Sequence, residues 1–148
     1  MYGGELVSLD AKGRMAIPTK MRDDLQPEKV GQLYITVHAF DPCLVLYTQE
    51  EWLQEADFYN RMPARELKVR TLRRRILGQV ASVSLDSAGR ILLPQRLRDV
   101  AKLEKKVMFS GMGARAEIWC EELWNQYQAD DEGVPEDGTH DALDQHHY

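Results

Sequence analysis

The sequence contains no long hydrophobic run and only two cysteines. No apolar stretch approaches the roughly 20 residues that a membrane-spanning helix needs, and the N-terminal Met-Tyr-Gly-Gly-Glu lacks the basic and then apolar pattern of a signal peptide. Cys43 and Cys120 form no CxxC pair and have no histidine at ligand spacing, which predicts neither a zinc site nor a disulfide framework. We therefore expect a cytoplasmic protein without membrane segments, in which both thiols pack among apolar neighbours.

Motifs that mark common enzymes are missing as well. The chain has no glycine-rich phosphate loop, no nucleophile elbow and no HExxH pattern. His38 is the sole histidine outside the C-terminal end and lies in a strand-like run, where a packed or surface imidazole is expected. A set of possible transition-metal ligands lies near the C-terminus: His140, Asp141, Asp144, His146 and His147. Metal binding there would have to order a flexible tail, and the loss of chain entropy disfavours it. The sequence thus predicts no enzyme, no catalytic residue, no metal site, no cofactor and no small-molecule substrate.

Positive charge is absent from the C-terminal end. The 148 residues carry 19 Lys and Arg against 24 Asp and Glu, a net charge of -5. All 19 cations lie in residues 1–116 with 14 acids, so this part carries +5, whereas residues 117–148 hold the other ten acids and carry -10. A net acidic chain would ordinarily disfavour nucleic acid, because phosphates are bound by positive potential. Here the acidity belongs to one end, and DNA binding by the remainder is not excluded.

The strongest positive signal is an internal repeat. Residues 7–23 read VSLDAKGRMAIPTKMRD and residues 83–99 read VSLDSAGRILLPQRLRD, with nine identities in 17 positions at an offset of 76. Both copies also end alike, since Leu46-Tyr47 is echoed by Ile118-Trp119 at an offset of 72. A unit of about 45 residues buries little apolar surface alone, so we expect the two copies to share one core with approximate twofold symmetry.

Each copy predicts the order strand, turn, strand, short helix, strand, turn, strand. The strands of the first copy are expected at 5–9, 14–17, 33–38 and 43–47. Residues 10–13 have the composition of a turn, with a glycine able to adopt positive φ, so the first two strands are expected to form a hairpin. Residues 80–120 repeat this unit.

Pro18 suits the first turn of the short helix in the first copy. Helical spacing then predicts that Met21 and Leu25 face inward, while Lys20 and Arg22 face outward.

The segment between the copies predicts helix over residues 49–77, with an interruption at Pro63. Its second half is strongly basic, and Leu67, Leu72 and Ile76 are expected to form its apolar stripe. Residues 121–128 mirror the helix that opens at residue 49, so a C-terminal helix is expected after the second copy.

The repeated motif carries a family resemblance. Leu9-Asp10-Ala11-Lys12-Gly13-Arg14-Met15-Ala16-Ile17-Pro18 and Leu85-Asp86-Ser87-Ala88-Gly89-Arg90-Ile91-Leu92-Leu93-Pro94 resemble the paired D-x-x-x-R motifs of the bacterial MraZ family, which contains two tandem SpoVT-AbrB domains. The similarity covers roughly residues 1–128, including the Asp-Pro-Cys-Leu turn. It implies a β-rich α+β fold, in which two tandem β-β-α-β-β repeats form an AbrB-like swapped-hairpin β-barrel within one chain, with peripheral helices.

Four segments follow from the repeat, the resemblance and the composition. They are a first SpoVT-AbrB repeat over 1–48, a basic helical connector over 49–78, a second repeat with a C-terminal helix over 79–128, and an acidic tail over 129–148. The tail holds seven acids and three histidines with almost no large aliphatic residue, which is typical of disorder.

The resemblance also implies a function. Members of the family are transcriptional regulators of the division and cell-wall gene cluster, bind direct repeats in promoter DNA and assemble into rings. By this resemblance the chain is expected to be a repressor of its own gene cluster, to bind double-stranded promoter DNA, to form a ring-like homo-oligomer and to lie in the cytoplasm and on the nucleoid.

The residues themselves supply a mechanism for binding DNA. A glycine-containing turn places Lys12 and Arg14 at a hairpin tip, and the next helix presents Lys20 and Arg22 nearby. Lysines neutralise phosphates, whereas an arginine can donate two hydrogen bonds to guanine in the major groove. The equivalent residues of the second copy are Arg90, Arg96 and Arg98, and Ala88 replaces the lysine of the first turn.

The aspartates and glycines of the motif are expected to build the turns. Asp10 and Asp86 should accept backbone N–H groups and could orient the arginine four residues on, while Gly13 and Gly89 supply the turn backbone. For the two arginines the alternative is an ion pair that only fixes the turn, although an exposed pair of this kind contributes only about 0–1 kcal/mol.

Two further alternatives stay open. The basic helix with Arg73, Arg74 and Arg75 is either a phosphate-binding patch or a solvated face or subunit contact. AbrB-type barrels also occur in antitoxins, so a protein-interaction module is the second functional hypothesis. The acidic tail has few of the apolar anchors that such a partner would need.

Overall fold

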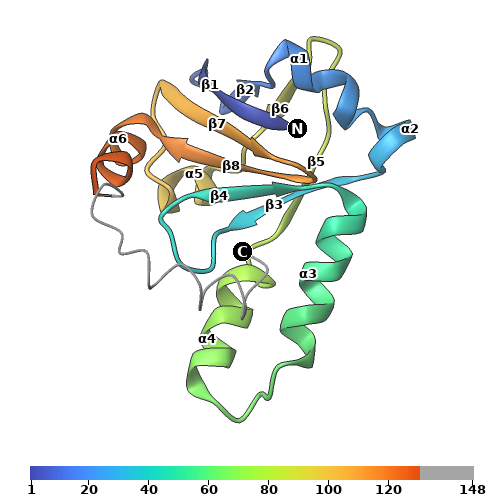
Figure 1. Cartoon of the computed structure of the whole chain (residues 1–148), viewed down its shortest axis with the longest axis vertical. Coiled ribbons are helices and arrows are strands. Elements are labelled where there is room, and N and C mark those ends of the chain that lie inside the picture. Colours follow the sequence, from blue (N-terminus) through green and yellow to red (C-terminus); the bar gives the residue numbers. More distant parts are fainter. Residues whose placement is uncertain (131–148) are drawn as a thin grey trace.

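Strands from both copies combine in one six-stranded antiparallel sheet. A computed structural model of the chain describes residues 1–130 and is shown in Figure 1. Across the sheet the strands are β1 (Tyr2–Ser8), β7 (Lys106–Met112), β8 (Arg115–Cys120), β4 (Leu44–Tyr47), β3 (Leu33–Val37) and β5 (Ala81–Val83). Together with the helices this is the predicted β-rich α+β class.

The first strand of each copy pairs with the other copy. β1 lies along β7, with Tyr2 opposite Met112, and β5 lies along β3, with Val83 opposite Leu33. The β3–β4 and β7–β8 hairpins meet at the centre of the sheet, where β4 pairs with β8. The strands themselves were predicted. The hairpin predicted from the first two strands is present only at its turn, where Leu9 bridges Met15 and the N–H of Asp10 donates to the carbonyl of Arg14 at 3.0 Å, because β1 forms its full ladder with β7.

The second strands of the two copies form a separate two-stranded ribbon. β2 (Arg14–Ala16) runs antiparallel to β6 (Arg90–Leu92), and Met15 lies opposite Ile91. Because equivalent residues differ by 76 in number, Met15 faces its own equivalent, and a local twofold axis passes through this pair. Within the described residues β1 and β5 end the large sheet without pairing to each other, so these ladders do not by themselves form a closed barrel.

Short helices follow the ribbon strands, and the longer helices follow the last strand of each copy (Figure 1). The short ones are α1 (Thr19–Arg22), a 3₁₀ turn (Asp23–Leu25), α2 (Pro27–Val30) and α5 (Gln95–Val100). The longer ones are α3 (Gln49–Arg61), α4 (Leu67–Ile76) and α6 (Glu121–Asp130). Pro18 and Pro94 precede α1 and α5, and the break between α3 and α4 contains Pro63, both as predicted.

Two apolar clusters lie on opposite faces of the large sheet. Leu44 and Leu46 point into the main core, which also contains Met15 and Ile91 of the ribbon and the predicted inward residue Met21. This core draws on both copies, as predicted. Val45 and Tyr47 lie on the other face of β4 and point toward α3 and α4. There they form a second cluster with Trp52, Tyr59 and Ile76.

One prediction for the connector was wrong. Leu67 is 64% exposed, and the buried residues of α4 are Val69 and Ile76. At 3.6 residues per turn, Val69 lies seven residues before Ile76 and on the same face, whereas Leu67 lies nine residues before it and points the opposite way. The helical period therefore excludes a stripe that contains both Leu67 and Ile76.

The remaining expectations have mixed outcomes. Cys43 is buried as predicted, whereas Cys120 is only half-buried. Among residues 1–130, no helix is both long and apolar enough to cross a membrane. The expected disordered tail lies outside the described residues from position 131 onward, and its three histidines lie there too; α6 continues to Asp130.

Candidate nucleic-acid interface

The first hairpin tip is built around the carboxylate of Asp10. One oxygen accepts the backbone N–H groups of Lys12 at 3.0 Å and Arg14 at 2.9 Å, and the other accepts Nε of Arg14 at 2.7 Å. The N–H of Gly13, which has a φ of 90°, closes the turn on the Asp10 carbonyl at 3.0 Å. The hydrogen bond from the Arg14 backbone is the main reason that the pKa of Asp10 lies below its usual value. These are the hydrogen bonds predicted for the turn.

The second tip repeats this geometry. Asp86 accepts the backbone N–H groups of Ala88 and Arg90, each at 2.9 Å, and Nε of Arg90 at 2.9 Å. Gly89 closes the turn on the Asp86 carbonyl at 3.0 Å. Replacement of the tip lysine by alanine leaves the turn unchanged because the turn uses the backbone N–H of that residue and not its side chain. The two tips differ in charge but not in hydrogen bonding.

Each tip arginine is anchored at one atom and open at the others. Nε of Arg14 and of Arg90 is bound to its aspartate, while the terminal Nη groups have no hydrogen-bond partner among the described residues. Both side chains keep 36% of their surface exposed. The aspartate thus limits the motion of the guanidinium and leaves the two Nη groups, with four N–H donors, for a phosphate or a base edge.

The ribbon aims both tip arginines away from the core. Met15 and Ile91 are buried, so alternation places their neighbours Arg14 and Arg90 on the outer face. On that face Arg14 lies opposite Leu92, which is 58% exposed. Sequence reasoning missed Leu92 as part of this surface, although strand alternation around Ile91 would have found it.

The other predicted DNA-binding cations are arranged differently. Lys12 and Lys20 are exposed and form no ion pair with any described residue. Arg96 is exposed and donates to the carbonyl of Gln79 at 3.1 Å. Arg22 was predicted to face outward, but it is half-buried and its Nε donates to a backbone carbonyl; Arg98 is bound in the same way. The structure therefore brings all seven cations to the tips and their following helices, with only some of them free.

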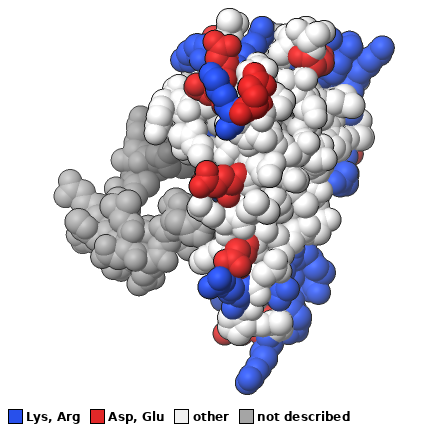
Figure 2. Space-filling view, turned by 90° about the vertical axis from the view of Figure 1, so that its right-hand side faces the viewer, with Lys and Arg blue, Asp and Glu red and all other residues white. Residues whose placement is uncertain are grey.

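The basic helix α4 lies away from these tips. Figure 1 places α3 and α4 at the opposite end from α1, β2 and β6. Figure 2 shows Lys and Arg toward both ends of one face, with mostly uncharged surface between them. Arg73 donates to Asn60 at 3.2 Å, and Arg75 donates to the carbonyl of His38 at 3.1 Å. Within the described chain no α4 cation forms an ion pair with a carboxylate.

His38 directly follows β3 and opens the hairpin turn between β3 and β4. Its Nδ1 accepts the backbone N–H groups of Phe40 at 3.0 Å and Asp41 at 2.9 Å, and its Nε2 lies 3.4 Å from a Glu117 carboxylate oxygen. The three side chains of His38, Asp41 and Glu117 form a cluster of metal-ligand type among the described residues. Because Nδ1 already accepts two backbone N–H groups of the turn, His38 has a structural role in the turn, as expected for a packed imidazole.

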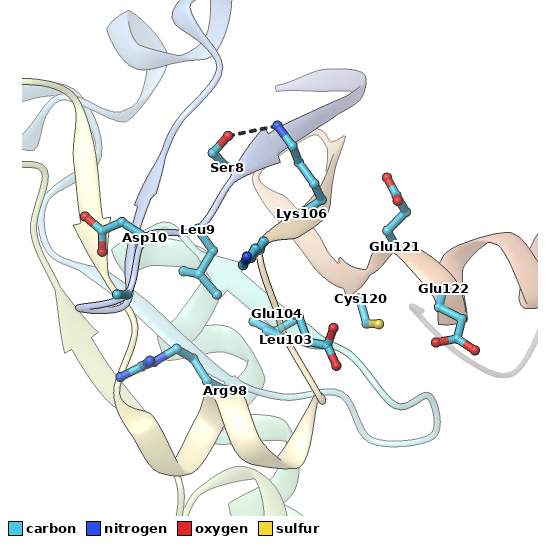
Figure 3. Close-up of a pocket in the computed structure, with 12 residues that line it drawn as sticks. Ser8, Leu9, Asp10, Arg98, Leu103, Glu104, Lys106, Cys120, Glu121 and Glu122 are labelled. Carbon is cyan, nitrogen blue, oxygen red and sulfur yellow. Dashed lines mark hydrogen bonds between the residues drawn. The ribbon is translucent and has the colours of Figure 1, made fainter.

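A groove of about 930 Å³ runs beside the first tip. Leu9 and Leu103 lie in it, and its charged lining includes Arg98, Lys106 and Glu122. Figure 3 shows Arg98 extending from its helix toward the turn that begins at Asp10. The groove carries charges of both signs and therefore offers no uniform field for a charged small molecule.

Comparisons with known proteins agree with the repeated motif. A family model described as "MraZ protein, putative antitoxin-like" matches residues 1–75 and again 76–145. A "Transcriptional regulator MraZ" of Pseudomonas putida is 42% identical over 129 residues, covering 87% of this chain and 85% of the relative. The protein of the same name from Marinobacter nauticus is 42% identical over 139 residues, covering 90% and 93%. Another, from Pseudomonas fluorescens, is 40% identical over 129 residues, covering 87% and 85%.

Proposed function

Because this chain belongs to the MraZ family, with relatives named transcriptional regulators, we propose that it regulates transcription by binding direct repeats in double-stranded promoter DNA. The name of these relatives describes a transcriptional regulator and not a class of enzyme. The proposal includes repression of its own division and cell-wall gene cluster, a ring-like homo-oligomer, and a place in the cytoplasm on the nucleoid. Residues 1–48 and 79–128 act as paired repeats, and residues 49–78 connect them.

One observation carries the proposal for DNA. Arg14 and Arg90 stand on the outer face of one ribbon, each held at Nε by an aspartate, and no described residue binds their Nη groups. A guanidinium that is already oriented loses less entropy when it binds a phosphate or a guanine edge. The exchanged first strands support an AbrB-like swapped-hairpin scaffold as the reason that both tips sit on one ribbon.

Multivalent binding follows from the small size of this surface. One chain offers a few cationic contacts and should bind DNA modestly, with strong weakening by salt. In a ring, the subunits are related by rotation about the ring axis, so each presents its tips in the same orientation to DNA that follows the ring. Repeats in the same direction, spaced by about one helical turn, would then engage several subunits and gain avidity.

The test begins with a footprint of the purified full chain on the DNA upstream of its own gene. Affinity is then measured on duplexes from which the protected repeats are removed one at a time. Affinity should fall steeply with each lost repeat. Equal binding to one repeat and to several would contradict the multivalent mechanism.

The tip arginine is tested with a matched control. Arg14→Ala should weaken binding to the protected DNA by roughly 5- to 150-fold, the value of one good arginine contact to a base. Arg61→Ala removes an arginine that is also paired through Nε with an aspartate four residues away, at 2.8 Å, but lies on α3. This control should bind like the unchanged chain. If the two variants bind equally well, the tip is not the DNA surface.

A protein-interaction module is the second candidate, and the antitoxin-like description of the family model is what favours it. The acidic tail, residues 129–148, would then hold a protein partner. A pull-down that compares the full chain with residues 1–128 separates the two functions. Loss of a stoichiometric protein partner together with unchanged footprints would favour the interaction module.

A further inference from the structure

Arg22 and Arg98 are equivalent residues of the two copies, and each is tied to its own copy at one atom. Nε of Arg22 donates to the carbonyl of Ile17 at 2.8 Å, and Nε of Arg98 donates to the carbonyl of Leu93 at 3.0 Å. Both carbonyls belong to the residue just before the proline that precedes the helix. Each guanidinium is therefore held at the end of its own ribbon strand.

The same two guanidinium groups lie against the turn glycine of the other copy. A Cβ atom built on Gly13 would lie 2.6 Å from Cζ and 2.8 Å from Nη2 of Arg98. A Cβ atom on Gly89 would lie 2.5 Å from Nε and 2.8 Å from Cζ of Arg22. All four distances are far below van der Waals contact, so each turn needs glycine because of the neighbouring arginine as well as for its positive φ.

Backbone hydrogen bonds close each of these contacts into a circuit. The carbonyl of Gly13 accepts the N–H of Leu93 at 2.8 Å, the carbonyl of Leu93 accepts Nε of Arg98, and the guanidinium of Arg98 returns to cover Gly13. The other circuit has the same three steps and joins equivalent residues: Gly89, Ile17 and Arg22. In both circuits a turn of one copy is held by the arginine and the strand end of the other.

We infer that Arg98 and Arg22 are positioning residues that act across the repeat: Arg98 holds the tip that presents Arg14, and Arg22 holds the tip that presents Arg90. This inference rests on the proposed function for its effect on DNA. The turn backbone sets where the tip arginine starts, because Gly13 directly precedes Arg14 and its N–H closes the turn on Asp10. Loss of the covering guanidinium frees that turn to move. Each half of the DNA surface is then completed by the opposite copy.

Double-mutant cycles, measured as DNA affinity, test whether Arg98 acts through Arg14 and not through Arg90. Arg98→Ala should weaken binding about tenfold, within the range for loss of one arginine contact. The same substitution should cost little more in a chain that already has Arg14→Ala, because the residue acts through that arginine. In a chain with Arg90→Ala the losses should multiply. A multiplicative loss with Arg14→Ala would overturn the inference, since Arg98 would then contact DNA independently.

Arg98→Lys distinguishes positioning from a phosphate contact and guards against a misfolded alanine variant. Lysine keeps the charge but lacks the planar group that bonds Leu93 and covers Gly13 at the same time. The positioning role predicts that Arg98→Lys stays weakened about as much as Arg98→Ala. Recovery of binding by lysine would show that charge alone matters and would overturn the inference.

Backbone hydrogen exchange on the full chain without DNA gives an independent arm. Arg98→Ala should speed exchange in residues 10–16, in the first copy, and Arg22→Ala should speed exchange in residues 86–92, in the second copy. Arg61→Ala should change neither segment. Faster exchange confined to the helix that bears each substitution would overturn the inference. If Arg14→Ala leaves DNA binding intact while exchange follows this pattern, the proposed function fails and the positioning role stands.

Discussion

At the scale of single residues, His38 makes the fold sensitive to pH. Its Nδ1 accepts two backbone N–H groups, so the folded chain holds a neutral imidazole. Burial lowers the pKa of His38 below its ordinary value of 6.5; Glu117 and Asp41 oppose this shift, and Arg115 and Arg75 add to it. Protonation of Nδ1 would remove the acceptor for both turn N–H groups.

The sign of the pH effect follows from this lowered pKa. Below about pH 6.5 the unfolded chain takes up a proton at His38 that the folded chain does not, so the free energy of unfolding should fall as the pH falls. The loss is at most about 1.4 kcal/mol for each pH unit. Urea unfolding between about pH 7.5 and about pH 5.5 measures it, a range that lies above the lowered pKa values of Asp10 and Asp86.

His38→Asn provides the control for this prediction. An asparagine side-chain oxygen can accept the same turn N–H groups but does not titrate. The variant should therefore lose the pH-dependent part of the unfolding free energy that belongs to His38, while every other histidine of the chain is retained. Identical pH profiles for the two proteins would show that His38 does not cause the effect.

At this scale, the contacts that could be predicted were those between residues close together in the sequence. The bonds of Asp10 follow from its spacing to Lys12 and Arg14, because a short turn leaves one geometry for them. The place of Arg22 did not follow, because its neighbour Gly89 belongs to the other copy and comes close only where β2 of one copy pairs with β6 of the other. Local patterns fix local contacts, and the cross-copy contacts needed the topology.

At the scale of elements, α3 is anchored to the sheet by a buried ionic cluster. Arg115, the first residue of β8, donates to Glu51 and, at 2.9 Å, to Glu55. The Glu55 side chain is only 1% exposed, and the Arg115 guanidinium also lies 5.1 Å from the Tyr47 ring centre. A carboxylate at this depth needs its cation, because burial of an uncompensated charge is strongly unfavourable.

Arg115→Ala should therefore lower the free energy of unfolding by about 3 to 5 kcal/mol, as expected when one partner of a buried pair is removed. Arg61→Ala is the control, because that pair with Asp57 is exposed and should contribute about 0–1 kcal/mol. Urea denaturation of both variants measures the difference. Equal losses would mean that the cluster does not anchor α3.

Element positions were predicted better than element partners. Alternation and prolines located the strands and helices of each copy, because these signals lie within a few residues. The partner of β1 was wrong because a turn between two β-prone segments predicts a local hairpin, whereas β1 gains seven residue pairs with β7 of the other copy. The error at Leu67, by contrast, could have been avoided from helical periodicity alone.

At the scale of the whole molecule, basic charge is divided between the tips and α4. The two regions lie at opposite ends in Figure 1, so one short duplex bound at the tips should not reach α4. Replacement of Arg73, Arg74 and Arg75 by alanine should leave affinity for a single-repeat duplex within about twofold, because no tip contact is lost. The assembled mass and the affinity for several repeats should fall together, since cations that form no ion pair with a described carboxylate suit contact with acidic surface of a neighbouring subunit.

Light scattering for mass and titration of single-repeat and multiple-repeat duplexes would check this prediction. Arg14→Ala should show the reverse pattern, with weak binding to every duplex and an unchanged mass. A loss on the single-repeat duplex as large as that of Arg14→Ala would instead identify α4 as a phosphate-binding surface.

The exchange of first strands also sets an order of events during synthesis. β1 leaves the ribosome early, but its partner β7 follows about 100 residues later, which takes about 5 to 20 s at ordinary rates of translation. Throughout that delay the strand has a free edge that can pair with another chain. Nascent chains that grow side by side on one messenger can therefore exchange first strands, and a lower density of ribosomes on that messenger should yield a larger fraction of chains that pair β1 with their own β7.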